Sequence, residues 1–165
     1  MLRWGILLAL LVLALDQATK FMIVAFVDQS YAGNLDIREI TPFFNIWHVR
    51  NSGIAFSLGN FNDGGRYFIG ILAFVVAGVL VFLGSKTDKR IVIAAYALIA
   101  GGAVGNAMDR LNPLRQTVVD FLDFHIGTAH WPSFNVADSA IVLGVALILI
   151  DMMFLSGKRK TISPE

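Results

Sequence analysis

Long apolar runs alternate with polar segments along the chain, and they predict four helices that cross a membrane. A helix that crosses about 30 Å of hydrocarbon needs about 20 mainly apolar residues. Four stretches meet this requirement, at residues 4–27, 67–84, 91–109 and 136–155. The pattern therefore predicts an α-helical integral membrane protein in which residues 1–165 form a single polytopic membrane domain.

The first apolar run has an alternative interpretation as a cleaved signal peptide. Arg3 precedes a long apolar stretch, as it does in secretory signals. The apolar sequence resumes at Phe21–Val27, and no convincing cleavage site of the small-x-small kind follows it. A retained helix is therefore the better prediction.

Lysine and arginine are concentrated at three places outside the apolar runs. The loop Ser85–Arg90 is short and basic, the tail contains Lys158–Lys160, and Arg3 precedes the first run. With four spans these places share one side, which the positive-inside rule makes cytoplasmic. We therefore expect both termini in the cytoplasm, with residues 28–66 and 110–135 facing outward across the plasma membrane.

The two outward segments contain stretches that predict short strands. Residues alternate between polar and apolar over Leu35–Ile40 and Phe44–Val49, and Thr117–Phe121 has a similar pattern. Such alternation is typical of half-buried strands. We expect a small outward-facing β-sheet on the membrane surface and an extracytoplasmic loop, with Trp47 and Trp131 as candidate interfacial anchors.

Composition supports a membrane location and excludes several kinds of chemistry. Only 15% of residues are charged, whereas soluble domains carry about 25%. The net charge of +1 argues against a nucleic-acid partner. Because the chain has no cysteine, it has no disulfide, thiolate metal site or cysteine nucleophile.

Polar side chains inside or at the ends of the predicted spans are the candidates for chemistry. A charge in hydrocarbon costs about 2.5–3.5 kcal/mol, so such residues usually face a functional interior. The residues concerned are Asp16, Lys20, Asn106, Asp109, Arg110 and Asp138.

Most of these residues also have a purely structural interpretation. Asp16 and Lys20 lie four residues apart on one helix face, where they can form a neutralised pair that orients the helix. The small residues of Gly101–Gly105 allow helices to approach closely. Asp109 and Arg110 at the end of that helix can then serve to brace it.

Asp120 and Asp138 are candidates for acid–base catalysis because both map to the outer ends of the third and fourth spans. Taken alone, Asp120 is an ordinary loop acid, and Asp138 can form a capping box with Asn135. Two neighbouring carboxyls, however, tend to share one proton. One can then activate water while the other donates a proton, which is sufficient for peptide hydrolysis without a cofactor.

Competing chemistries have weaker support in the sequence. The three histidines, His48, His125 and His130, lie outside the spans and lack a zinc-binding spacing. Ser52 is a weak candidate nucleophile, since no span contains a histidine to activate it. There is no phosphate-binding or dinucleotide-binding motif. We therefore expect no metal and no cofactor.

Five motifs in order along the chain resemble those of the bacterial lipoprotein signal peptidases (signal peptidase II). This family consists of four-span aspartyl proteases of the inner membrane, and the likeness runs from Asp16 to Gly144. The motifs are Asp16-Gln17-Ala18-Thr19-Lys20, Asn51-Ser52-Gly53-Ile54-Ala55-Phe56, Gly101–Asn106 with Asp109-Arg110, Val118-Val119-Asp120-Phe121, and Phe134-Asn135-Val136-Ala137-Asp138-Ser139.

The resemblance implies an outward-facing catalytic pair formed by Asp120 and Asp138. This pair would remove the signal peptide from a prolipoprotein by cleaving just before its diacylglyceryl-modified cysteine. The outward strands would form a cradle over the substrate, and the protein would be a monomer in contact with membrane lipid. The residues implied to line or support the site are Asn51, Gly105, Asn106, Asp109, Arg110, Asn135, Asp16 and Lys20.

Two other functions are compatible with polar residues in spans. A small proton-coupled transporter would use Asp16, Lys20 and Asp109 as a polar pathway through the membrane. A structural or assembly protein would use its polar residues only to hold helices together. The bias of the acids towards the outer half of the membrane favours the peptidase.

Overall fold

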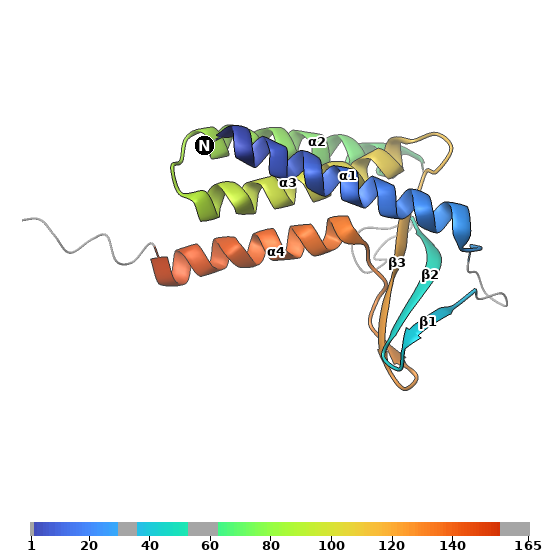
Figure 1. Ribbon diagram of the computed structural model, residues 1–165. Helices are drawn as coiled ribbons and strands as arrows, with labels where there is room; N and C mark the ends of the chain where they lie inside the picture. The colour runs from blue at the N-terminus through green and yellow to red at the C-terminus, as the bar shows by residue number, and fades with distance from the viewer. Residues whose placement is uncertain (1, 30–35, 53–62, 156–165) are drawn as a thin grey trace, which may run out of the picture.

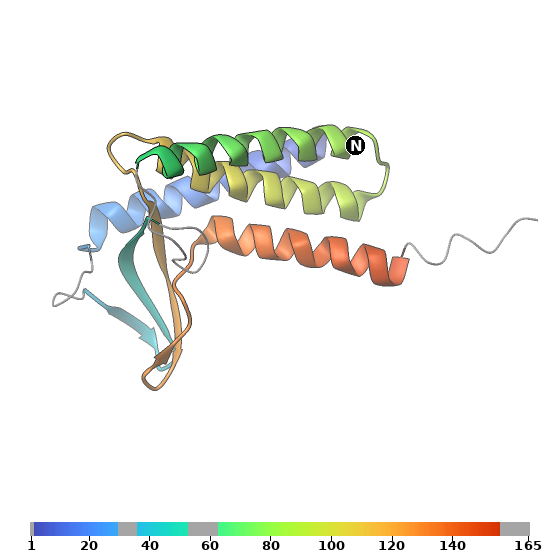
Figure 2. The same cartoon turned by 180° about the vertical axis from the view of Figure 1, so that it is seen from behind.

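The computed structural model describes residues 2–29, 36–52 and 63–155. Long helices run side by side, and a β-sheet projects from one end of the bundle (Figures 1 and 2). The N-terminus lies at the opposite end from the sheet, as does the end of the last helix. This arrangement separates the basic loop Ser85–Arg90 from the sheet, as the charge pattern predicts.

The helices follow the apolar runs closely. Within the described residues, four helices are long and apolar enough to cross a membrane, which confirms the predicted number. The third helix extends beyond the predicted end, so Arg110 belongs to its last turn and not to the outward segment. The helices are α1 (Leu2–Phe26), α2 (Asp63–Ser85), α3 (Arg90–Leu111) and α4 (Val136–Ile150), which continues as the π-helical turn η2 (Asp151–Leu155).

Helix α3 is the centre of the bundle. It packs against α1, α2 and α4, and half of its apolar window is buried, compared with 17–22% in the other spans. Gly101 faces the backbone of α1 and Gly102 faces the backbone of α4, with no room for a side chain at either position. The predicted close packing of small residues is therefore confirmed.

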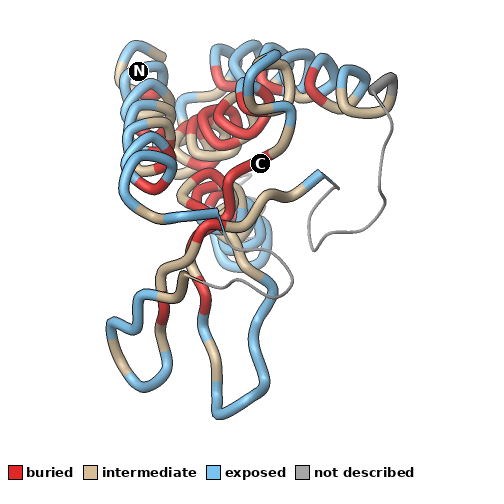
Figure 3. Tube along the Cα trace, turned by 90° about the vertical axis from the view of Figure 1, so that its right-hand side faces the viewer, coloured by how far each residue is buried: buried red, intermediate tan, exposed pale blue. Residues whose placement is uncertain are grey.

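The outer faces of α1, α2 and α4 are rich in exposed apolar side chains. Buried positions lie on the sides of the helices that face one another and at the base of the sheet (Figure 3). In a bilayer, lipid chains cover such apolar faces, so their exposure carries no cost there. The bundle interior, by contrast, holds several fully buried charged residues.

The sheet is antiparallel, and its described strands follow one another in chain order. The prediction at Phe44–Val49 is confirmed, but β3 continues beyond the predicted stretch and β4 was not predicted. Val119 and Phe121 pack against Ile23 of α1, which attaches the sheet to the bundle. The strands are β1 (Arg38–Thr41), β2 (Phe44–Asn51), β3 (Val118–Ile126) and β4 (Ala129–His130).

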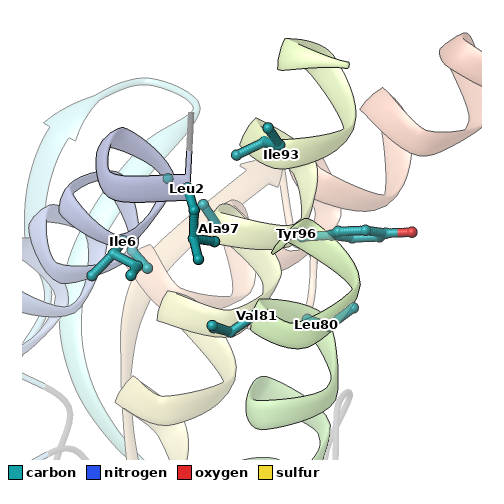
Figure 4. A pocket seen from close by; sticks show the side chains of 10 residues that line it. Leu2, Ile6, Leu80, Val81, Ile93, Tyr96 and Ala97 are labelled. Atoms are coloured by element: carbon teal, nitrogen blue, oxygen red, sulfur yellow. The ribbon is translucent and has the colours of Figure 1, made fainter. Parts of the chain in front are cut away.

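A small apolar crevice lies between α1, α2 and α3 near the end of the bundle that is opposite to the sheet (Figure 4). Its cavity volume is about 20 Å³, which is close to the space that one water molecule needs. A crevice of this size does not hold a peptide or a lipid chain. Its labelled residues are Leu2, Ile6, Leu80, Val81, Ile93, Tyr96 and Ala97.

Candidate active site

A much larger cavity, of about 600 Å³, opens where the end of α3 and the start of α4 meet the sheet. Its polar residues include both acids predicted for catalysis, and the face of α4 supplies an apolar wall. The cavity therefore joins polar groups to a surface that continues into the membrane. The lining residues are Asn51, Asn106, Arg110, Val118, Asp120, Trp131, Pro132, Ser133, Phe134, Asp138, Ser139, Ile141, Val142, Leu143 and Ala146.

Asp138 is held by the start of α4. The side chain of Asn135 accepts from the Asp138 backbone N–H at 3.0 Å, and the Asn135 backbone N–H donates to Asp138 Oδ2 at 3.2 Å. The predicted capping box is therefore confirmed. Asp138 Oδ1 accepts from Asn106 Nδ2 at 2.8 Å, and both residues line the cavity.

Asp120 lies on β3 and is almost fully buried, with an exposed fraction of 2%. Its Oδ1 accepts from Asn135 Nδ2 at 2.7 Å, and its Oδ2 accepts from Asn51 Nδ2 at 2.9 Å. Burial raises the pKa of the Asp120 carboxyl to about 6, and the nearby charge of Asp138 acts in the same direction, while the two amide donors oppose the shift. The group can therefore take up a proton near neutral pH.

Two asparagines connect the carboxyls of Asp120 and Asp138. Asn135 donates both to Asp120 and, at 3.2 Å, to Asn106 Oδ1, while its backbone binds Asp138. Asn106 donates to Asp138 through its other amide atom. Each asparagine therefore fixes the orientation of the other, and together they hold both acids in one hydrogen-bonded group.

Lys20 lies behind this group with no exposed surface. Its Nζ is 2.9 Å from Asp16 Oδ2, 2.8 Å from Asp109 Oδ2 and 2.9 Å from Asn106 Oδ1. The predicted pairing of Asp16 with Lys20 is confirmed, but Lys20 also binds a second carboxylate. Lys20 therefore forms ion pairs with two carboxylates and a hydrogen bond with one amide oxygen, and these three contacts fix its position.

Asp16 connects this buried ion group to α4. Its Oδ1 accepts from the backbone N–H of Ala137 at 3.0 Å, in the first turn of that helix. Gly105 packs directly against the Asp16 carboxylate. Arg110 lines the cavity itself and donates to the Asn106 backbone oxygen at 3.3 Å. The helix-bracing interpretation therefore fits Asp109, whereas Arg110 reaches the cavity.

The structure adds Arg115, which no sequence pattern indicated. Its Nη1 lies 2.7 Å from Asp109 Oδ1 and 3.3 Å from Gln17 Oε1. A single basic residue in a polar loop normally points into water, so its contact with a buried acid could be found only from the fold.

Trp47 and Trp131 occupy different environments around the cavity wall. Trp47 Nε1 donates to Ser133 Oγ at 2.9 Å, and its ring stacks on His130. Trp131 lines the cavity and is 61% exposed. Trp47 therefore supports the wall.

The Gly53–Phe56 part of the second motif lies outside the described residues.

The fold and the linked carboxyls define a multi-pass membrane protein with an acidic site at the end of the bundle that carries the sheet. A family described as "Signal peptidase (SPase) II" matches residues 8–154. The chain therefore belongs to the signal peptidase II family, which is a family of aspartic peptidases.

Relatives and solved structures agree with this assignment. A lipoprotein signal peptidase of Aeromonas hydrophila is 46% identical over 99% of this chain and 95% of the relative. One from Vibrio vulnificus is 42% identical over 90% of this chain and 87% of the relative. Two solved structures of bacterial membrane enzymes are each 31% identical, with TM-scores of 0.81 and 0.72 and coverage of 98% and 92% of this chain, and of 94% of each solved chain.

Proposed function

We propose that this chain removes signal peptides from lipid-modified prolipoproteins, with Asp120 and Asp138 as the catalytic carboxyls. Family membership supports the activity, since the relatives are lipoprotein signal peptidases. The observation that carries the assignment of the site is that Asn135 binds both carboxyls, beside a cavity that both acids line.

The chemistry requires one ionised and one protonated carboxyl. The ionised group takes a proton from water, and the resulting hydroxide attacks the scissile carbonyl carbon while the protonated group donates to its oxygen. The tetrahedral intermediate then breaks at the C–N bond as a proton passes to the leaving nitrogen. The raised pKa of Asp120, about 6, supports its ability to exchange a proton in this cycle.

The apolar wall of the cavity supports a substrate that arrives from the bilayer. The apolar residues of this wall follow Asp138 along α4, and they are Ile141, Val142, Leu143 and Ala146. At about 1.5 Å per residue, this wall extends about 12 Å into the membrane from the acids. An apolar signal peptide or an acyl chain can lie against it while the scissile bond stays at the polar end.

The supporting residues have separate roles in this proposal. Asn51 and Asn135 donate to Asp120, and Asn106 donates to Asp138. Arg110 provides a positive charge at the cavity wall for the developing oxyanion or a lipid headgroup. The other supporting residues do not line the cavity, and they form a buried group that fixes the positions of Asn106 and the start of α4. They are Asp16, Lys20, Gly105 and Asp109.

The chain is a multi-pass bacterial membrane protein, and its orientation follows from the charge pattern. We place both termini and the loop Ser85–Arg90 in the cytoplasm and the cavity on the outer face of the inner membrane. We further propose that the enzyme works as a monomer in contact with lipid and has no nucleic-acid partner. The acid pair performs the hydrolysis without a metal or another cofactor.

The proposal is tested by measuring cleavage of a purified diacylglyceryl-modified precursor. Asp120→Asn and Asp138→Asn should each abolish turnover while the protein stays folded, because an amide can neither activate water nor donate an acidic proton. Asp123→Asn is the matched control, since Asp123 is also buried on β3 but does not line the cavity. Near-normal turnover by either site variant would refute the aspartic mechanism, and a transporter or assembly protein would cleave nothing.

A further inference from the structure

We propose that Arg115, in the loop between α3 and β3, is a positioning residue for the cleavage step. The inference rests on the function proposed above. Arg115 lies outside the cavity lining and reaches the site through a sequence of contacts. Its guanidinium binds Asp109, Asp109 binds Lys20, Lys20 binds Asn106, and Asn106 donates to Asp138.

The loop conformation directs Arg115 towards the bundle. The backbone N–H groups of Arg115 and Gln116 donate to the Asn112 carbonyl at 3.1 and 2.9 Å. Gln116 has a φ of 61°, a left-handed conformation that residues other than glycine rarely adopt. The turn reverses the chain directly after Arg115, whose side chain is only 19% exposed. A loop that adopts this conformation places the guanidinium against Asp109.

Charge balance explains why this contact matters. The buried ion group contains two acids, Asp16 and Asp109, but only one base, Lys20. Arg115 supplies the second positive charge at 2.7 Å from Asp109 Oδ1. Without Arg115, the two buried carboxylates share the single charge of Lys20, and an uncompensated buried negative charge is less favourable than the absence of both Arg115 and the Asp109 charge. Arg50 also faces Asp109, but the short contact is made by Arg115.

The effect reaches the catalytic acid through the orientation of one amide. Asn106 Oδ1 accepts from Lys20 and from Asn135, so its Nδ2 must face Asp138. If Asp109 lacks Arg115, its unbalanced charge draws Lys20 away from Asn106. The amide then loses one of the donors that set its orientation, and Asp138 loses a fixed hydrogen-bond donor. Small misplacements of this kind can lower turnover by about a hundredfold.

The test compares Arg115→Gln with Arg38→Gln in the purified full-length protein. Arg38 also pairs with an acid on the outer side, but its side chain is 57% exposed, so it controls for the loss of a surface charge. Cleavage of the lipidated precursor should show a kcat about 10–100-fold lower for Arg115→Gln. The KM should stay within about twofold, because Arg115 does not line the cavity. Arg115→Lys, which keeps the charge, should recover part of the kcat.

A double variant tests whether Arg115 acts through Asp109. Arg115→Gln combined with Asp109→Asn removes both charges, so it should have no lower kcat than Asp109→Asn alone and a higher unfolding temperature than Arg115→Gln alone. If Arg115→Gln does not fold but the double variant does, the inference is supported. If neither variant folds, the inference is refuted. A normal kcat in Arg115→Gln, or strictly additive losses, also refutes it. Either result leaves the proposed function intact, since that stands or falls with Asp120 and Asp138.

Discussion

Replacement of Gly105 by alanine tests how tightly the buried ion group is packed. A Cβ at this position would lie 2.5 Å from Asp16 Oδ2, the oxygen that pairs with Lys20. To reach an ordinary contact of about 3.4 Å, the carboxylate must retreat by roughly 0.9 Å. Asp16 is fully buried and is also bound by the Ala137 N–H, so it has little freedom to move.

The expected cost follows from these contacts. Overpacking a well-packed interior costs about 1–3 kcal/mol, and a weakened charged hydrogen bond adds to this. At about 2–4 °C per kcal/mol for a chain of this size, the Tm should fall by several degrees. Precursor turnover should fall as well, because Asp16 and Lys20 hold the start of α4 and the Asn106 amide.

Gly78→Ala is the matched control for Gly105→Ala. Gly78 lies within the membrane helix α2, and a Cβ there would meet nothing within 4 Å. That change should leave Tm unchanged or raise it, since alanine is favoured over glycine in a helix by about 1 kcal/mol. Thermal unfolding in detergent and cleavage kinetics compare the two variants. If Gly105→Ala were as stable and active as Gly78→Ala, the packing argument would be wrong.

Two further predictions concern protonation and orientation. Asn51→Ala should raise the pKa of Asp120 above about 6, because the ionised carboxylate loses a hydrogen-bond donor at 2.9 Å. The limb of the kcat/KM pH profile that reports Asp120 should therefore move to higher pH. A shift of that limb to lower pH would contradict the assignment. Because the chain has no cysteine, single introduced cysteines report topology. In intact spheroplasts an impermeant thiol reagent should label Leu114→Cys, which lies at a loop position that is 93% exposed, and should label Thr87→Cys only after permeabilisation.

Asp120 also links protonation to stability. Its pKa is higher in the folded protein than the ordinary value of 3.8, so the folded state binds a proton more tightly between about pH 4 and pH 6. The contribution of this group therefore favours folding at low pH and is lost as the pH rises through about 6. This sign is opposite to that of a carboxylate stabilised by a salt bridge.

The sequence alone determined the number of spans and their approximate ends, because hydrocarbon thickness sets the length of an apolar helix. It also determined the Asp16–Lys20 pair and the Asn135–Asp138 capping box, since both are interactions between residues three or four positions apart on a helix. The motif resemblance then brought Asp120 and Asp138 together as a candidate pair. Local geometry and the family pattern did not determine which other distant side chains are in contact.

Only the tertiary structure decided which distant side chains meet. Lys20 meets Asp109 because α1 packs against α3. Asn51 meets Asp120 because β2 pairs with β3, and Arg115 meets Asp109 because the loop after α3 turns back towards that helix. These contacts depend on helix rotation, loop conformation and side-chain reach, and none of these follows from spacing along the chain. A buried charge must find a partner in the folded interior, and the fold alone determines which partner is within reach.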